Sequence, residues 1–246
     1  MALITNSVSS PKRLICFDLD GTLTQHKTPL GPEARELLDK LGKKYKLIMV
    51  GAGNAPRIWN QMGHYPIGIL GNYGMQEAVV SEDGELTIVR EDTVVPDKEM
   101  FLEKVAYLRR RYGYEKYYGE SVEFHPAGMV TFCLLGTPAP IEEKLAFDPT
   151  REKRRVLYDE VLELFPDHSV YIGGSSSFDF TPKQYNKYDA IMKYADENGY
   201  ALDEILYVGD DYDDGGGDSH VRIKGMDYIF IDDYTTTPAR LQFLLD

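Results

Sequence analysis

The chain has little cysteine, a shortage of positive charge and no long apolar run, and each of these features argues against a class of protein. Its two cysteines, Cys16 and Cys133, lie in apolar strand-like segments, where a buried reduced thiol is usual. A disulfide-stabilised or thiol-dependent protein is therefore not expected. The 27 basic residues are outnumbered by 40 acidic ones, so nucleic acids and anionic membranes would repel a chain of net charge −13.

No apolar run approaches the roughly 20 residues of a membrane span, and residues 1–10 lack the charged start and apolar stretch of a signal peptide. We therefore expect a cytoplasmic protein whose partners are small molecules and cations. The hydrophobic content of 43% is enough to fill a sizeable core. The sequence does not determine the oligomeric state, for which a dimer is one option.

The N-terminal part of the chain alternates strand patterns with helix patterns. Short apolar runs predict strands at 13–17, 46–50 and 67–70, and apolar residues at helical spacing predict helices at 31–45 and 56–62. The order β-α-β-α-β predicts a parallel sheet with right-handed crossovers.

After residue 75 the pattern changes, and it returns to the first type only near residue 183. Asp83-Gly84 between two short strand patterns is a strong hairpin signal, and mixed strand and helix patterns follow it. Buried strands are predicted again near the C-terminus. We therefore predict an α/β fold with a Rossmann-like parallel-sheet core, formed by 1–84 and 182–246, and an inserted α+β cap domain at 85–181.

Acidic side chains follow the predicted core strands at the edge where parallel sheets bind ligands. Asp18 and Asp20 follow the first strand, and the tract GDDYDDGGGDSH contains Asp210 and Asp218. Two unit charges ~4 Å apart repel by roughly 1 kcal/mol in water and about 4 kcal/mol at an effective dielectric constant of 20. Such a cluster calls for a cation, and a set of oxygen ligands favours magnesium over zinc.

Two other interpretations apply to the second acidic tract. A solvated turn is an open alternative for that tract taken alone. A calcium-binding EF-hand loop fits poorly, because Tyr212 and Val221 would stand where oxygen ligands are required.

The segment FDLDGTLT, Phe17 to Thr24, resembles the DxDGT motif of the haloacid dehalogenase-like (HAD) superfamily of phosphoryl-transfer enzymes. The resemblance implies that Asp18 attacks phosphorus and that Asp20 acts as general acid and then as general base. A carboxylate nucleophile divides one difficult displacement into two, and a nearby carboxyl can protonate the leaving alcohol. The resemblance also implies a magnesium ion held by Asp18, Asp20, Asp210 and Asp218, with Asp218 completing or supporting the shell.

The resemblance assigns further residues around the phosphate. A lysine after the cap usually pairs with the phosphoryl group; Lys187 stands at the matching place, and Lys183 is the competing candidate. The motif after the second strand normally ends in a serine or threonine that binds the phosphate, but here the loop offers no hydroxyl. Backbone N–H groups and one amide are expected to replace it, from Gly51, Ala52, Gly53 and Asn54.

Within the superfamily, the pattern resembles enzymes with a C2-type cap and most closely the eukaryotic-type phosphomannomutases. The match includes Gly173-Gly174, Ser177-Phe178-Asp179 and the tract that begins at Gly209. Those mutases hold the distal phosphate of a hexose bisphosphate with cap arginines, whereas the aligned positions here are Thr137 and Ile172. Arginines on predicted helices could substitute, although a solvated helix face is their usual environment; these are Arg109, Arg110, Arg111, Arg151, Arg154 and Arg155.

We therefore expect a magnesium-dependent phosphatase that hydrolyses a small phosphorylated metabolite, with a sugar phosphate as the leading candidate, through an aspartyl-phosphate intermediate. Thr137, Ser177 and Asp179 are expected to contact the non-reacting end of the substrate. The alternative is a phosphomannomutase-like hexose-phosphate mutase, whose cap must hold the bisphosphate intermediate while it turns round. A non-catalytic metal- or metabolite-binding protein is the third interpretation, but it would have no need of Asp20.

Overall fold

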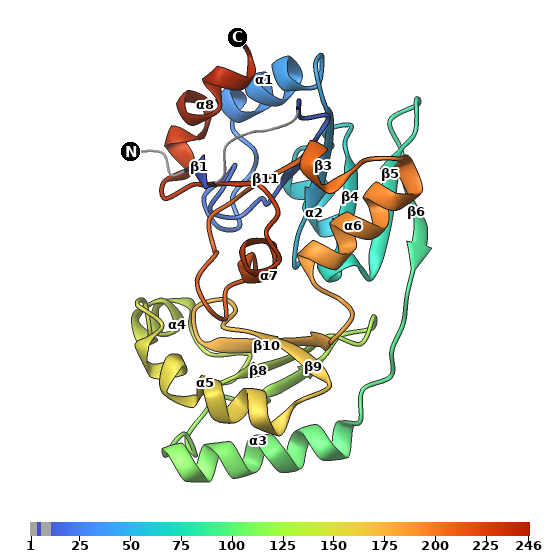
Figure 1. Ribbon diagram of the computed structural model, residues 1–246. Helices are drawn as coiled ribbons and strands as arrows, with labels where there is room; N and C mark the ends of the chain where they lie inside the picture. Colours follow the sequence, from blue (N-terminus) through green and yellow to red (C-terminus); the bar gives the residue numbers. More distant parts are fainter. Residues whose placement is uncertain (1–3, 6–10) are drawn as a thin grey trace. The chain divides into compact units, whose positions relative to one another are not determined.

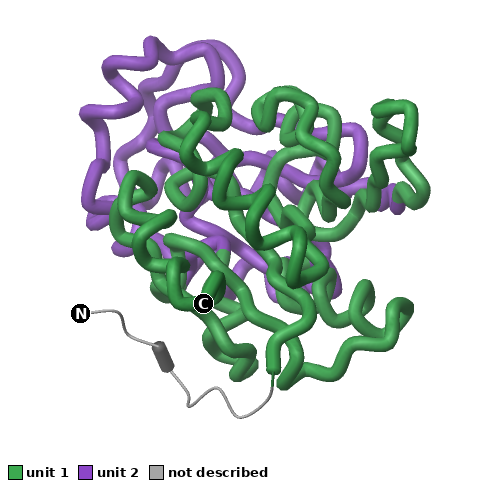
Figure 2. Tube along the Cα trace, turned by 90° about the horizontal axis from the view of Figure 1, so that it is seen from above, with its two compact units in different colours: residues 1–91, 186–214, 218–246 green, residues 92–185, 215–217 purple. Residues whose placement is uncertain are grey.

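The computed structural model describes residues 4–5 and 11–246, and the chain divides into two compact units (Figures 1 and 2). Unit 1 contains the residues up to Glu91, then Asn186–Asp214 and Asp218–Asp246, and unit 2 contains Asp92–Tyr185 and Gly215–Gly217. Of the N-terminal residues considered for a signal peptide, only 4 and 5 are described. Among the described helices, none has the length and apolar character that a membrane span needs.

Unit 1 is built on an eight-stranded sheet with the order β1-β12-β11-β2-β3-β4-β5-β6. The strands from β12 to β4 in this order are parallel, while β1 at one edge and the β5–β6 hairpin at the other are antiparallel. The strands are β1 Ile4–Thr5, β2 Leu14–Phe17, β3 Lys46–Val50, β4 Gly68–Gly71, β5 Gln76–Val80, β6 Leu86–Glu91, β11 Ile205–Gly209 and β12 Tyr228–Phe230.

Helices cover both faces of the unit 1 sheet, which explains why its central strands are continuously apolar. Successive side chains of β2 point to opposite faces: Ile15 and Phe17 pack with α1, α2 and the segment that follows α8, whereas Leu14 and Cys16 pack with α6 and α7 (Figure 1). The helices are α1 Pro32–Leu41, α2 Ala55–Gln61, α6 Lys187–Asn198, α7 Ser219–Ile223 and α8 Thr237–Arg240.

Unit 2 is a four-stranded antiparallel sheet, in the order β7-β8-β10-β9, with α3 and α5 packed on one face (Figure 1). Phe132 and Phe178 point to these helices, while the adjacent register pair Thr131 and Asp179 points to the other face. The elements are α3 Lys98–Tyr112, β7 Val122–Phe124, β8 Val130–Cys133, α4 Ile141–Phe147, α5 Glu152–Leu164, β9 His168–Tyr171 and β10 Ser177–Pro182.

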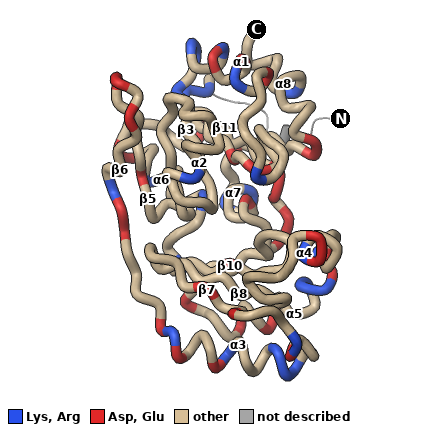
Figure 3. Tube along the Cα trace, turned by 180° about the vertical axis from the view of Figure 1, so that it is seen from behind, with Lys and Arg blue, Asp and Glu red and all other residues tan. Residues whose placement is uncertain are grey.

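The predicted fold class is confirmed. Unit 1 runs to Glu91 and resumes at Asn186, whereas the predicted core runs to 84 and resumes at 182, and Gly215–Gly217 fall in unit 2. Leu86–Glu91 pairs with β5, so the hairpin stays in the sheet of unit 1. Helix α6 begins at Lys187, because Asn186 caps it by accepting a hydrogen bond from the N–H of Asp189. Acidic and basic positions occur in both units (Figure 3). Both cysteines are buried and neither forms a disulfide, as predicted.

Candidate active site

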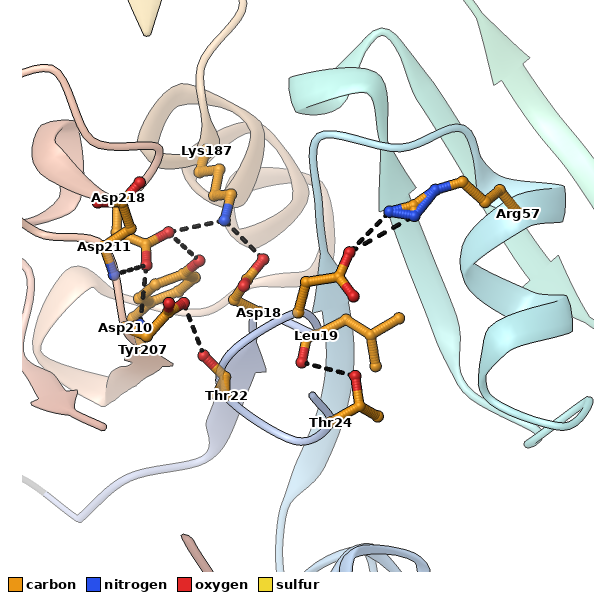
Figure 4. A network of polar contacts seen from close by, with 11 residues as sticks. Asp18, Leu19, Thr22, Thr24, Arg57, Lys187, Tyr207, Asp210, Asp211 and Asp218 are labelled. Atoms are coloured by element: carbon orange, nitrogen blue, oxygen red, sulfur yellow. Dashed lines mark hydrogen bonds and ion pairs between the residues drawn. The ribbon is translucent and has the colours of Figure 1, made fainter. Parts of the chain in front are cut away.

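The loop after β2 places Asp18 at the carboxyl end of the central strands. The N–H of Asp18 donates to Val208 O of β11 at 2.9 Å, which continues the sheet by one residue. Gly21 follows with a φ of +90°, and a Cβ at this position would collide with the carboxylate of Asp210. Thr22 Oγ1 also donates to Asp210 Oδ1 at 3.2 Å. The glycine and threonine of the motif therefore allow Asp210 to lie against the Asp18 loop (Figure 4).

Lys187 joins Asp18 to Asp218. As the first residue of α6, it donates from Nζ to Asp18 Oδ1 and to Asp218 Oδ1, both at 2.7 Å, and all three side chains are buried. Burial alone would lower the pKa of Lys187, but the two carboxylates outweigh it and raise that pKa. Lys183 instead donates to Pro166 O in unit 2, at 3.1 Å. Of the two candidate lysines, the structure therefore places Lys187 beside Asp18.

Asp218 is held by donors on both of its oxygens. Oδ1 accepts from Lys187 and from the hydroxyl of Tyr207 at 2.7 Å, and Oδ2 accepts from the N–H groups of Asp210 at 3.2 Å and Asp211 at 3.0 Å. This side chain thus orients Lys187 and fixes the acidic loop, in keeping with a supporting role around a metal. Tyr207 was not predicted, because it lies inside the apolar run of β11 and nothing in the sequence distinguishes it from a core residue.

Asp18 and Asp210 are the carboxyls of this site whose ionised forms are disfavoured. Burial, opposed by Lys187, raises the pKa of Asp18 to about 6, and burial together with the charge of Asp18 raises the pKa of Asp210 to about 8. Across residues 4–5 and 11–246, no group of three or more His, Cys, Asp or Glu side chains is arranged to hold a metal. A buried carboxyl and a half-buried one that resist ionisation together nevertheless fit a hard divalent cation such as magnesium.

We expect magnesium to stabilise the protein more at a pH of about 8 than at a pH of about 5. A carboxyl whose folded pKa is raised contributes stability below its unfolded pKa, and this contribution is lost as the pH rises through the folded value. For Asp18 and Asp210 that window extends from the unfolded value of 3.8 up to about 6 and about 8. The measurement is the melting temperature with magnesium or with EDTA, and Asp210→Asn is the control that should lose most of the pH dependence. An equal magnesium effect at both pH values would contradict this assignment.

Asp20 has the opposite environment to Asp18. Its Oδ2 accepts from Arg57 Nη2, and its Oδ1 accepts from Gln61 Nε2 and from the N–H of Lys27, each at 2.7 Å. Burial disfavours its ionised form, but these hydrogen bonds and the charge of Arg57 prevail and lower the pKa of Asp20. Asp20 is therefore ionised in the ligand-free site, where it can act as a general base, and it must take up a proton before it can act as a general acid. Arg57 and Gln61 were not predicted, although their i, i+4 spacing after the glycine loop places them on one helix face.

Part of the predicted phosphate-binding loop is used in holding unit 1 together. The N–H of Gly51 donates to Leu70 O at 3.0 Å, and Asn54 Oδ1 caps α2 by accepting from the N–H of Arg57 at 2.8 Å. Gly53 O accepts from the N–H of Asn72 at 2.8 Å. Phosphate binding by this loop stays a prediction, and the N–H of Gly51 is already engaged in the sheet.

The residues predicted to contact the substrate in unit 2 are divided between a strand and a loop. Asp179 Oδ1 accepts from Thr131 Oγ1 at 2.8 Å, and burial raises the pKa of Asp179. Ser177, on the same strand, donates to Gly173 O at 3.0 Å, whereas Thr137 lies beyond β8 and donates to Glu120 O at 3.1 Å. Their contact with substrate stays a prediction.

Two arginines expected on a solvated helix face are buried instead, which corrects that expectation. Arg154 donates from Nε to Asp148 Oδ2 at 2.9 Å and from Nη1 to Gly173 O at 2.7 Å. Arg109 donates to Cys133 O at 2.7 Å and to Leu134 O at 3.0 Å. Each guanidinium binds backbone carbonyl groups of unit 2, so both serve its fold.

Comparison with known proteins shows the family. A family model described as eukaryotic phosphomannomutase matches residues 34–235. The phosphomannomutase of Saccharomyces cerevisiae is 28% identical over 242 residues, covering 92% of this chain and 87% of that protein. The phosphomannomutase of Schizosaccharomyces pombe is 27% identical over 237 residues, covering 87% of this chain and 86% of that protein.

Solved structures show the same fold at low sequence identity. A sugar phosphatase of HAD subclass IIB superposes with a TM-score of 0.61 at 16% identity, covering 96% of this chain and 100% of the other. An IMP-bound nucleotidase from Plasmodium falciparum superposes with a TM-score of 0.66 at 13% identity, covering 97% of this chain and 69% of the other. Together with the family match over most of the chain, these results show that the protein belongs to the eukaryotic phosphomannomutase family, a branch of the HAD superfamily with a C2-type cap.

Proposed function

We propose that this protein catalyses phosphoryl transfer on a hexose phosphate through an aspartyl phosphate at Asp18. The observation that carries the proposal is the pairing of two differently held carboxyls: Asp18, bound by Lys187, and Asp20, bound by Arg57. The first suits a nucleophile and the second an acid–base group. Relatives named phosphomannomutase, which align along most of their length, support a hexose phosphate as substrate.

In the proposed reaction, Lys187 binds Asp18 Oδ1 and leaves Oδ2 to attack phosphorus. The bond between phosphorus and the sugar oxygen breaks, and this oxygen takes up a proton from Asp20, which Asp20 must first have bound from solvent. Magnesium held by Asp18 and Asp210 would reduce the repulsion between the attacking carboxylate and the phosphate dianion. In the second half, Asp20 takes a proton from the incoming hydroxyl, which attacks phosphorus and regenerates Asp18.

The identity of that hydroxyl separates a mutase from a phosphatase, and we place the hexose-phosphate mutase first. The family match and the relatives support it better than they support hydrolysis. The incoming group is then a hydroxyl of the sugar, and the intermediate is a hexose bisphosphate.

A sugar phosphatase is the second candidate, and unit 2 favours it. A second phosphate in a poorly hydrated site is best held by arginine, whose guanidinium binds it with two hydrogen bonds. The positions aligned with the family's cap arginines are Thr137 and the buried Ile172, and Arg109 and Arg154 are committed to the fold. In that case water attacks the aspartyl phosphate.

We expect mannose 6-phosphate to form ahead of free phosphate when the protein is given mannose 1-phosphate, magnesium and a trace of mannose 1,6-bisphosphate. A mutase returns the phosphoryl group to a sugar, and the bisphosphate keeps Asp18 phosphorylated at the start of each cycle. Both products are measured in one sample, with Asp18→Asn as the control for contaminating enzymes. Free phosphate that leads the 6-phosphate and does not respond to the bisphosphate would replace the mutase with the phosphatase.

A further inference from the structure

Arg57 lies over the glycine loop that follows β3 and reaches the loop of Asp20. Its Nη2 is 2.7 Å from Asp20 Oδ2, and Figure 4 shows the guanidinium extending from α2 toward the Asp18 loop. A Cβ at position 53 would come within 2.8 Å of Arg57 Nε and 3.1 Å of its Cζ. Gly53 does not have a positive φ, so its backbone conformation does not call for glycine. What glycine provides here is room for the guanidinium.

The ion pair between Arg57 and Asp20 is too exposed to be explained by stability. The Arg57 side chain is 42% exposed and that of Asp20 is 21% exposed. Pairs of this kind contribute about 0.2–1 kcal/mol because water screens them. The buried guanidinium of Arg154 is only 1% exposed and cannot leave its partners, whereas Arg57 is free to exchange one anionic partner for another.

A phosphoryl group arriving beside Asp18 and Asp20 needs positive charge that the rest of the loop does not supply. Lys187 already donates to two buried carboxylates. The loop has no hydroxyl, and the N–H of Gly51 is bound in the sheet. Arg57 carries the guanidinium that stands next to the acid–base carboxyl, and a guanidinium binds two oxygens of a phosphate at once.

We propose that Arg57 is a substrate-binding residue of this site. When a phosphate ester binds, the guanidinium exchanges Asp20 for two oxygens of the transferring phosphoryl group and so replaces the hydroxyl that the loop lacks. The exchange also removes the hydrogen bonds that Arg57 gives to Asp20 Oδ2 as the leaving oxygen approaches. The inference rests on the proposed function in taking a phosphate ester as the ligand.

The first test is the affinity for inorganic phosphate in the presence of magnesium, measured by isothermal titration calorimetry on the full chain. Arg57→Met is expected to weaken binding by about 10- to 100-fold, since hydrogen bonds to charged groups contribute about 1.5–3 kcal/mol and each 1.4 kcal/mol is tenfold. Arg57→Lys should have an affinity for phosphate between those of the wild type and Arg57→Met, because an ammonium keeps the charge but cannot donate two parallel hydrogen bonds as a guanidinium does. The matched control is Arg13→Met, which removes another exposed arginine, paired with Glu204 at 3.0 Å, and should bind like the wild type.

The second test is a double-mutant cycle with Gly53→Ala, which displaces the guanidinium without removing its charge. We expect Gly53→Ala to weaken phosphate binding several-fold in the wild type and to have no further effect in Arg57→Met. Melting temperatures close to that of the wild type establish that each variant is folded. Equal effects of Gly53→Ala in both backgrounds, wild-type affinity in Arg57→Met, or no phosphate binding by the wild type would each overturn the inference.

The outcome for Arg57 is separable from the outcome for the proposed function. Arginine-dependent phosphate binding without turnover of any hexose phosphate would support the inference and overturn the proposed function. Turnover of mannose 1-phosphate together with phosphate binding that does not depend on Arg57 would support the proposed function and overturn the inference.

Discussion

Asp18→Asn is expected to lower the turnover of phosphate esters by a factor of at least about 10⁴ and to leave the fold intact. The amide oxygen can still accept the hydrogen bond that Lys187 gives to Asp18 Oδ1, so the side chain keeps its place. The substitution removes the proposed nucleophile and one of the proposed ligands for magnesium. Because the substitution also removes a carboxyl whose pKa burial raises to about 6, the metal-free variant should melt no lower than the wild type at neutral pH.

The readouts are the rate of phosphate release, the circular dichroism spectrum, and mass spectrometry of the peptide that contains Asp18 after a brief exposure to substrate. The wild type should show a phosphorylated peptide and Asp18→Asn should not. Asp20→Asn is the matched control: it should lose less activity on a substrate with a good leaving group, which needs no proton in the first step. Substantial activity in Asp18→Asn would rule out the aspartyl phosphate.

Arg154→Met is expected to destabilise unit 2 by about 3–5 kcal/mol, the usual result of leaving one partner of a buried ion pair without the other. The side chains of Arg154 and Asp148 are 1% and 2% exposed. The guanidinium also binds the carbonyl oxygens of Gly173, Gly174 and Ser177, which precede or begin β10. Loss of Arg154 therefore leaves an anion and several acceptors in a dry interior.

Urea unfolding measures this effect, and Arg155→Met is the control, because Arg155 is the next residue of α5 and is exposed. Burial opposes the ionisation of Asp148, but hydrogen bonds from Arg154 and from the N–H of Lys153 outweigh burial and lower its pKa. A lowered pKa contributes stability above the unfolded value, and this is lost as the pH falls through the folded value. The difference between wild type and Arg154→Met should thus shrink in acid. A difference equal to that of Arg155→Met would contradict a structural role for Arg154.

Patterns along the chain were enough to predict the α/β fold class and to place Asp18 and Asp20 just after a central strand, because these depend on local periodicity and on the end of one strand. The apolar run of β2 identifies the sheet, and the residues that follow it lie at the edge where ligands bind. Strand and helix patterns could not decide between Lys183 and Lys187, which lie four residues apart. The difference follows from the cap at Asn186, which starts the helix late enough to point Lys187 at Asp18.

Side chains whose role depends on a distant partner could not be predicted. Arg57 acquires its role from Asp20, which lies 37 residues earlier, and Tyr207 acquires its role from Asp218, which lies 11 residues later. Arg154 stands at a polar position of an amphipathic helix and would ordinarily face water. It is buried because Asp148, six residues earlier, turns back to pair with it.

The strand order of unit 1 also determines when its sheet can be completed during synthesis. Strand β11 lies between β2 and β12, so β2 has no neighbour on that side until residues 205–209 have been made. Most of unit 2, in contrast, is the continuous stretch Asp92–Tyr185, whose strands pair within it. Because contacts between distant segments form slowly and domains fold as units, unit 2 can acquire its structure on the ribosome before β2 has β11 beside it.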